Sequence, residues 1–181
     1  MQQNDAENPI LAATETIICE EGLSNLSIKT IADKIGQSKS AIYYHYDSKH
    51  DLLLNFLQYL HDELETLLVS LEDLDPEKQL AALTKELTDI DNRRKRNLRV
   101  AIMSLRCEAP HDAEIAQMFT QIDTILYEQV NQLYKEIGAS NPGRSAALLL
   151  SAIDGLVNRA ISHTRPIQVD DVAKTLPQRF L

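Results

Sequence analysis

Residues 27–46 read Ser-Ile-Lys-Thr-Ile-Ala-Asp-Lys-Ile-Gly-Gln-Ser-Lys-Ser-Ala-Ile-Tyr-Tyr-His-Tyr. Ser27 is a favourable N-cap, isoleucines then recur at helical spacing, and Gly36 can end this helix after little more than two turns. Ser38 can cap a second short helix whose apolar residues turn inward. Two short helices around a tight glycine turn are typical of the helix-turn-helix, whose second helix enters the major groove of DNA.

The second helix of this pattern, residues 38–46, carries hydroxyls, a lysine and aromatic rings instead of the Glu and Lys of an ordinary solvated face. Hydroxyl and phenol groups donate to phosphate oxygens, and small polar residues at a helix N-terminus approach base edges. The positive end of the helix dipole also attracts phosphate. The alternative is that Tyr43 and Tyr46 fill the small bundle, and the sequence leaves open whether one of them is mainly a core residue.

The charge distribution is uneven along the chain. A net charge of −9 and a pI near 5.0 argue, taken alone, against a nucleic-acid binder. Residues 27–50, however, hold four lysines against two acids, whereas residues 51–92 hold eleven acids and two lysines. A second basic cluster covers residues 93–99. It fits a solvated turn, a supplementary phosphate contact, or pairing with Glu20 and Glu21, of which pairing is favoured because clustered like charges attract acidic neighbours.

Helical periodicity and helix-end signals continue through the rest of the 181 residues, and no strand pattern competes. The expected helix boundaries lie at Gly22, a capping box of Ser48 with Asp51, Asp75-Pro76, Pro110, Asp112, Gly138 to Gly143, and Asp170. These signals predict an all-α fold of about nine helices: an N-terminal three-helix bundle containing the helix-turn-helix, followed by a larger C-terminal helical bundle.

Residues 10–54 resemble the DNA-binding domain of TetR-family transcriptional regulators. The resemblance rests on Ile31–Gly36, on Ser38–Tyr46, on Ser48-Lys49 and on Asp51-Leu52-Leu53. Two positions depart from the family's usual pattern. Gln37 stands where a small apolar turn residue is common, so it can loosen the turn or reach a phosphate itself, and Tyr46 stands where Phe is more usual.

The resemblance implies a transcriptional regulator that binds a palindromic operator in double-stranded DNA as a homodimer, and the family's habit favours a repressor. It implies phosphate contacts by Tyr43, His45 and Lys49, groove-facing positions for Lys39, Ser40 and Tyr44, and positions near the DNA backbone for Lys29 and Thr30. Ser38, which begins the recognition helix, is also expected to bind DNA. Lys39 can donate to guanine O6 and N7, or bind a phosphate instead.

The resemblance also divides the chain into a DNA-binding domain, residues 1–50, and a ligand-binding and dimerisation domain, residues 51–181. The family typically senses a small molecule, here unidentified, among its middle helices. The candidate pocket residues, each of which can equally be plain core, are Phe56, Tyr59, Leu60, Met103, Arg106, Cys107, Phe119, Ile122 and Tyr127. Arg106 suits an anionic ligand, or it pairs with Glu108 or with acids of the long helix that follows residue 48.

Residues 146–157 are apolar around too much of the helix circumference for a helix with one wet face. A fully buried core helix is the alternative to a dimer interface. The segment resembles the family's dimerising helix, in which Gly155 permits close approach, and the last segment would complete a four-helix bundle across a twofold axis. The predicted interface residues are Leu149, Leu150, Ile153, Gly155, Leu156 and Val157.

Other classes of protein have little support from the sequence. No glycine-rich phosphate loop, nucleophile elbow or His-Glu metal motif appears, and Cys19 and Cys107 are far apart, so we expect no enzyme, no cofactor and no metal. No apolar run approaches the ~18 residues of a spanning helix, and the first residues do not resemble a signal peptide, so we expect a cytoplasmic protein. The remaining rival is a helical protein-interaction module without specific DNA binding.

Overall fold

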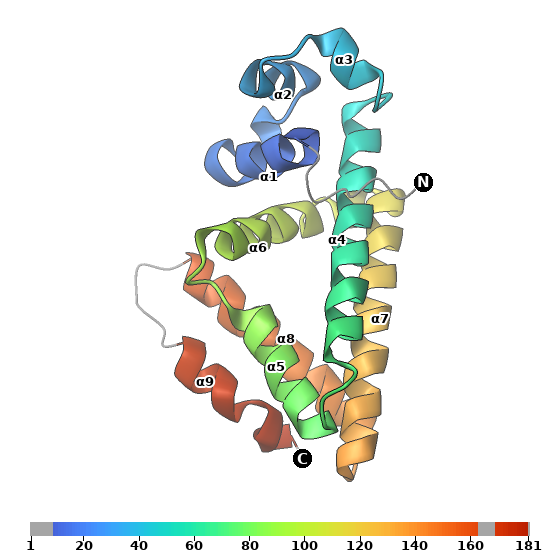
Figure 1. Ribbon diagram of the computed structural model, residues 1–181, viewed down its shortest axis with the longest axis vertical. Helices are drawn as coiled ribbons and strands as arrows, with labels where there is room; N and C mark the ends of the chain where they lie inside the picture. The colour runs from blue at the N-terminus through green and yellow to red at the C-terminus, as the bar shows by residue number, and fades with distance from the viewer. Residues whose placement is uncertain (1–8, 163–168, 181) are drawn as a thin grey trace. The chain divides into compact units, whose positions relative to one another are not determined.

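The computed structural model describes residues 9–162 and 169–180, which form nine α-helices and no strand (Figure 1). The α-helices are α1 (Pro9–Glu21), α2 (Ile28–Ile35), α3 (Lys39–Tyr43), α4 (Lys49–Leu71), α5 (Pro76–Thr88), α6 (Arg93–Arg106), α7 (Ala113–Ile137), α8 (Pro142–Ser162) and α9 (Val169–Thr175). Three short 3₁₀ helices are η2 (Leu23–Asn25), η3 (Ala109–His111) and η4 (Pro177–Phe180). The all-α prediction is confirmed.

The chain forms two compact units. The first comprises the described residues up to Asp62 together with Asn97–Phe119, and the second comprises Glu63–Arg96 and the described residues from Thr120 onward. Helices α4, α6 and α7 therefore contribute to both units. These units are defined by compactness and not by function. The expected boundary at residue 50 between the DNA-binding domain and the ligand-binding domain stays a prediction.

In the first unit α1 contacts η2 and α2, and α2 contacts α3. The apolar stripe expected on α1 is buried, with Ile17 and Ile18 almost completely inaccessible. The one polar residue in that stripe, Thr14, is satisfied because its hydroxyl donates to the carbonyl of Ile10 at 2.8 Å. Gly22 ends this part of the chain with a φ of 87°, a conformation that favours glycine.

Most helix starts follow the predicted signals. The carboxylate of Asp112 accepts from the backbone N–H groups of Glu114 and Ile115, each at 3.1 Å, as an N-cap of α7. Asp75 occupies the N-cap position of α5, but its carboxylate accepts from Lys78 at 2.6 Å and makes no capping bond.

The predicted capping box at the start of α4 is only half correct. Ser48 Oγ accepts from the N–H of Asp51 at 3.0 Å, as expected. The prediction of a reciprocal bond from the N–H of Ser48 to Asp51 is wrong. The Asp51 carboxylate accepts instead from the N–H of Asp47 at 2.9 Å, because the turn before the helix brings that N–H close to it. The start of α4 is thus fixed by two side-chain bonds that differ from the usual pairing.

The second unit has a continuous apolar core, within which α5 contacts α8 and α9, and η4 contacts α8. The residues of this core are Leu68, Leu80, Leu83, Leu87, Val130, Leu133, Tyr134, Ala146, Leu149, Ile153 and Val157. Tyr134 is completely buried, its hydroxyl donates to the carbonyl of Pro177 at 2.9 Å, and burial raises the pKa of this phenol to about 12. One hydrogen bond therefore ties η4 to the middle of the unit.

None of the helices in the described ranges is both long and apolar enough to cross a membrane.

Replacing Tyr134 by Phe removes this bond and leaves a buried carbonyl without its partner. We expect a loss of about 1–2 kcal/mol in the free energy of unfolding, measured by urea denaturation. Tyr44→Phe is the matched control, because that ring is 86% exposed and its hydroxyl has no partner within the described ranges. Equal stabilities for the two variants would show that the bond to Pro177 contributes nothing.

Candidate nucleic-acid interface

The turn between α2 and α3 has a well-defined backbone. Gly36 adopts the left-handed conformation with φ 68° and ψ 30°, and its N–H donates toward the carbonyl of Asp33. The next N–H, that of Gln37, donates to the carbonyl of Ala32 at 2.9 Å. These two bonds form a Schellman motif, which satisfies the last carbonyls of α2 and turns the chain toward α3. The turn is therefore closed in the expected way, and Gln37 has not loosened it.

Side-chain caps fix the beginnings of both helices. Ser27 and Thr30 form a reciprocal capping box on α2, in which Ser27 Oγ accepts from the N–H of Thr30 at 3.1 Å and Thr30 Oγ1 accepts from the N–H of Ser27 at 2.9 Å. Ser38 Oγ accepts from the N–H of Ala41 at 3.2 Å. The predicted caps at Ser27 and Ser38 are confirmed, so both helices start where the sequence indicates.

Residues of the recognition segment separate into an inner and an outer set. Ile42 is fully buried and Tyr46 is 7% exposed, whereas Tyr43 is 54% and Tyr44 86% exposed. Of the two tyrosines considered as core residues, Tyr46 takes that place and Tyr43 does not. Lys39, Ser40 and His45 are also exposed. The His45 and Tyr44 rings are nearly perpendicular, with centroids 5.3 Å apart.

Lysines of the first unit differ in how they are engaged. Lys34 lies 3.8 Å from a carboxylate oxygen of Glu20 and 3.5 Å from one of Glu21. Lys29 and Lys39 are exposed and form no ion pair within the described ranges, so their charges are available to an anionic partner. Lys34 is thus near both acids that were expected to pair with the cluster at residues 93–99, and that pairing stays a prediction.

Three of the predicted DNA contacts have structural partners, and the first is Ser38, whose hydroxyl caps α3. The Thr30 hydroxyl is occupied in the capping box of α2. Lys49 Nζ donates to the carbonyl of Leu23 at 3.0 Å, which ties the start of α4 to η2. An ammonium has three donors, so this bond leaves Lys49 able to donate to a phosphate as well.

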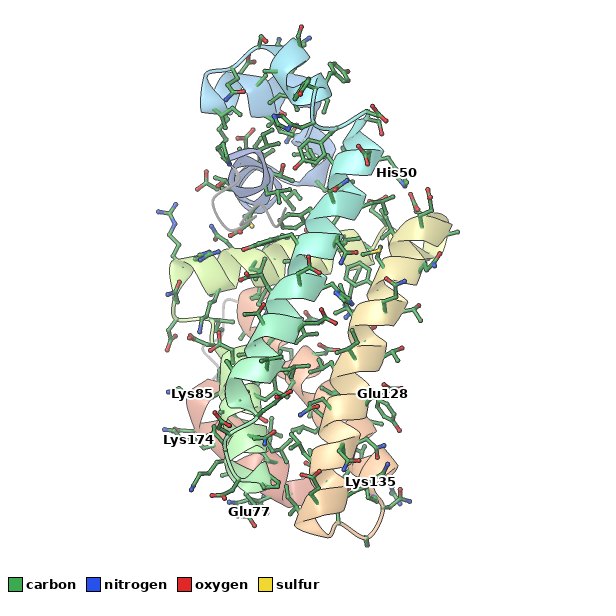
Figure 2. All side chains as sticks on the ribbon, turned by 45° about the vertical axis from the view of Figure 1, so that its right-hand side comes forward. His50, Glu77, Lys85, Glu128, Lys135 and Lys174 are labelled. Carbon is green, nitrogen blue, oxygen red and sulfur yellow. The ribbon has the colours of Figure 1, made fainter. Side chains whose placement is uncertain are left out.

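His50 is a further residue of this region, and sequence reasoning did not single it out. Its Nε2 lies 3.0 Å from the carboxylate of Asp112 and 3.6 Å from that of Glu114, so the first turn of α4 meets the N-terminus of α7 within the first unit. Figure 2 shows His50 at this end of α4. The hydrogen bond from the N–H of Ile115 holds the pKa of Asp112 below its ordinary value. The nearby His50 lowers this pKa by a smaller amount. No local sequence signal joins residues so distant along the chain.

Comparison with known proteins identifies both parts of the chain. Residues 10–56 match the family described as bacterial regulatory proteins, tetR family, and residues 62–180 match the tetracyclin repressor-like C-terminal domain. The chain belongs to the TetR family. The family resemblance of the sequence is confirmed, and this family consists of DNA-binding transcriptional regulators, not enzymes.

Individual relatives agree with this assignment. The chain is 28% identical over 168 residues to the HTH-type transcriptional regulator TtgR of Pseudomonas putida, covering 83% of this chain and 77% of that protein. A TetR transcription regulator from Haloarcula marismortui is similar with a TM-score of 0.83 and 27% identity, covering 98% of this chain and 97% of that one. A regulator from Saccharomonospora viridis, solved in complex with choline, shares the fold with a TM-score of 0.85 and 22% identity, over 97% and 95% of the two chains.

The predicted pocket residues are divided between the two units of this TetR-family chain. Phe56, Tyr59, Leu60 and Phe119 are buried in the first unit, Met103 and Arg106 are half-buried there, and Cys107 is exposed. Ile122 is half-buried and Tyr127 exposed in the second unit. The structure brings together Phe56 with Tyr59, ring centroids 6.4 Å apart, and Arg106 with Phe119, the guanidinium carbon 4.5 Å from the ring centroid. Their role in ligand binding stays a prediction.

The predicted interface residues of α8 fall on two sides of the helix. Leu149, Ile153 and Val157 are buried in the core of the second unit itself. Leu150 and Leu156 are half-buried, while Gly155 is exposed and a Cβ built on it would meet nothing within 4 Å. Leu148 is 43% exposed on the same face as Gly155, one heptad earlier, so it belongs to the surface available to another chain.

The basic cluster that begins α6 is partly explained by an acid of α5 and by the residue that follows this helix. Lys95 Nζ lies 2.6 Å from a carboxylate oxygen of Glu86 and 2.9 Å from one of Asp89. These bonds raise the pKa of Lys95 and lower that of Asp89. The carbonyl of the Asn92 side chain caps the helix by accepting from the N–H of Arg94 at 2.9 Å. The role of the arginines stays a prediction.

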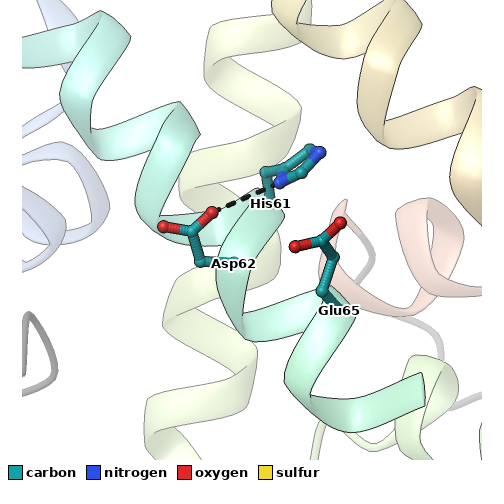
Figure 3. Close-up of side chains that lie close together, drawn as sticks. All are labelled: His61, Asp62 and Glu65. Atoms are coloured by element: carbon teal, nitrogen blue, oxygen red, sulfur yellow. Dashed lines mark hydrogen bonds and ion pairs between the residues drawn. The ribbon is translucent and has the colours of Figure 1, made fainter. Parts of the chain in front are cut away.

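Three side chains on α4 have the chemistry of metal ligands. Figure 3 shows His61, Asp62 and Glu65, whose ligand atoms lie within 4.8 Å of one another, with His61 Nδ1 3.3 Å from the Asp62 carboxylate. Both carboxylates are exposed, and Asp62 also accepts from Gln58 at 2.8 Å. Neighbouring positions on one helix reach this spacing without an ion, so we assign the cluster no metal.

The two thiols are in different environments. Cys107 is exposed, whereas Cys19 is half-buried and its Sγ donates to the carbonyl of Asn97 at 2.7 Å. Burial, with a smaller contribution from Glu15, raises the pKa of the Cys19 thiol to about 11. Because the thiolate is the reactive form, the raised pKa makes Cys19 the less reactive thiol near pH 8.

We therefore expect a thiol-specific chromogenic reagent at pH 8 to modify one cysteine of the folded protein rapidly and the second far more slowly. The Cys107→Ser variant is expected to lose the fast phase, and Cys19→Ser the slow one. Raising the pH toward 10 accelerates the slow phase by increasing the thiolate fraction. A fast phase that survives in Cys107→Ser would contradict this account of the Cys19 environment.

Proposed function

We propose that this chain is a ligand-responsive repressor that binds a palindromic operator as a homodimer and is released when a small molecule occupies the C-terminal domain. The observation that carries the proposal is the outer face of the helix-turn-helix. There Lys29 and Lys39 have no ion pair within the described ranges, and two tyrosine rings extend into solvent beside them. Unpaired lysines and exposed tyrosine rings contribute nothing to the fold of this acidic chain, so their presence together on one face indicates a binding surface.

The proposed dimer compensates for the small number of cations on each recognition surface. Each recognition surface offers few lysines for phosphate, so one copy binds weakly, and a dimer that reads two half-sites about one helical turn apart adds the two contributions. The exposed strip of α8 around Leu148 and Gly155 supports α8 as the interface. The glycine offers another helix a place of close approach.

A small-molecule effector is supported by the C-terminal domain match and by the fold relative that was solved in complex with choline. Among the predicted pocket residues, Arg106 is the best candidate for an anionic ligand. It is half-buried, and its guanidinium lies against the Phe119 ring, which orients it.

Ligand and operator compete through conformation in this proposal. The ligand favours a state in which α6 and α4 shift, so that the two recognition helices of the dimer no longer match the spacing of the half-sites. By linkage, the operator then weakens ligand binding by the same factor that the ligand weakens operator binding. We expect the protein to act in the cytoplasm, where its DNA is.

The test is selection of random duplex DNA on the purified ligand-free protein at two salt concentrations. We expect a palindrome with half-sites about one helical turn apart, retained at the higher salt. Tyr44→Ala is expected to weaken binding to this site by roughly tenfold without a change in thermal stability, because the ring lies outside the core. Binding is measured by fluorescence anisotropy.

Val69→Ala is the control, since it truncates an exposed side chain on α4 and leaves α3 unchanged. Binding that depends on salt but not on sequence would contradict a ligand-free repressor. That result would favour the helical interaction module, in which the acidic charge of the chain is the better guide.

The dimer is tested on α8. Leu148→Glu places a charge in the proposed interface, and Gly155→Ala adds a Cβ that the isolated chain accommodates freely. We expect both changes to raise the dimer dissociation constant at least tenfold in sedimentation equilibrium, while thermal stability of the monomer is retained. Val69→Glu is the control, because it makes the same kind of change at a residue of α4 that is 64% exposed. Equal dissociation constants for all variants would exclude this face of α8.

A further inference from the structure

The side chain immediately before the recognition helix has no structural partner. Gln37 is exposed, and within the described ranges its amide group meets no hydrogen-bonding partner, although its backbone N–H is held by Ala32. The backbone on both sides is fixed, by the left-handed Gly36 and by the cap at Ser38. The position of this residue is therefore defined while its side chain is available.

An apolar residue at this position would be better for the stability of α3. Gln37 is the residue before the N-cap, and Ile42, which is fully buried, is the fourth residue of the helix. A hydrophobic pair at these two positions is the staple that fixes the entry of the chain into a helix. A helix of five residues needs such support more than a long one does. A polar side chain that gives up this contact and gains no partner indicates a use outside the folded chain.

The chemistry of the side chain fits a base edge. A primary amide presents a donor and an acceptor side by side, which match N7 and N6 of adenine in the major groove. Lys39 and Ser40, which open α3, are exposed next to Gln37. In helix-turn-helix proteins this N-terminal end of the recognition helix contacts base edges.

We propose that Gln37 reads a base in each operator half-site, with adenine as the preferred base, and so contributes to the sequence specificity of the protein. This rests on the proposed function, because it requires α3 to enter the major groove of a specific site. It adds to the predicted DNA contacts a residue that carries no charge and can discriminate between base pairs.

The experiment compares wild type with Gln37→Val and Gln37→Glu by selection on random duplexes, followed by titration of the best site and of its single-base substitutions. Wild type is expected to select adenine at one position of each half-site. Gln37→Val is expected to lose this preference alone, with roughly tenfold weaker binding to the best site per half-site. Its melting temperature should be equal or higher, because Val can form the staple with Ile42.

Gln37→Glu is expected to shift the preference at the same position toward cytosine, since a carboxylate accepts from the cytosine amino group. Gln117→Glu is the matched control, because it makes the same change in charge at an exposed residue of α7. The control should select the wild-type site. If Gln37→Val melts at a lower temperature than wild type, the proposal is decided by the base that Gln37→Glu selects at this position.

Two results would overturn the inference while the proposed function stands: the same selected site for wild type and both variants, or equal weakening on every sequence, which is the behaviour of a phosphate contact. Failure of the proposed function is distinguished by the wild type itself, which would then select no palindrome.

Discussion

The left-handed conformation of Gly36 is the constraint on which the recognition surface depends. Its φ of 68° lets two successive N–H groups close the end of α2 and brings Ser38 to the position from which it caps α3. An L-residue with a Cβ would be strained in this conformation. Without the turn, α3 would lose the packing that buries Ile42, and the polar face of the helix would have no fixed direction.

The segment around α3 combines two requirements in very few residues. Ile42 and Tyr46 provide the burial that holds the segment on its unit, and the residues between and before them remain exposed. A short helix makes few contacts of its own, so its stability comes from caps and from these two side chains. The exposed side chains of Tyr43, Tyr44, Lys39 and Gln37 consequently do not support the fold. Such side chains can be changed to suit DNA without loss of stability.

Electrostatics explains how an acidic chain can bind an anionic partner. In the second unit Glu86 and Asp89 pair with Lys95, and exposed charges farther away are screened within about 8–10 Å at physiological salt. Side chains such as Lys85 and Glu128 extend into solvent from α5 and α7 of that unit (Figure 2). In the proposed complex, the charge that matters to a phosphate is that of its immediate neighbours, for which Lys29 and Lys39 are the candidates, and not the total of the chain.

The sequence by itself determined what depends on neighbouring residues. The caps at Ser27, Ser38 and Asp112 and the turn at Gly36 are interactions across three to five positions, and all were predictable because the partners are close along the chain. The motif of residues 31–46 likewise identified the family. Local reasoning failed where a neighbouring N–H competed, as when Asp51 accepted from Asp47.

Only the tertiary structure decided which partner each distant group finds. The bonds of Lys49 to Leu23, His50 to Asp112 and Tyr134 to Pro177 join residues whose proximity depends on how whole helices pack. The same holds for α8, where a helix that is apolar on most sides buries Leu149 and leaves Leu148 exposed. Periodicity shows that a helix has an apolar face, but the direction of that face is set by the shapes and volumes of the other helices, which no single segment contains.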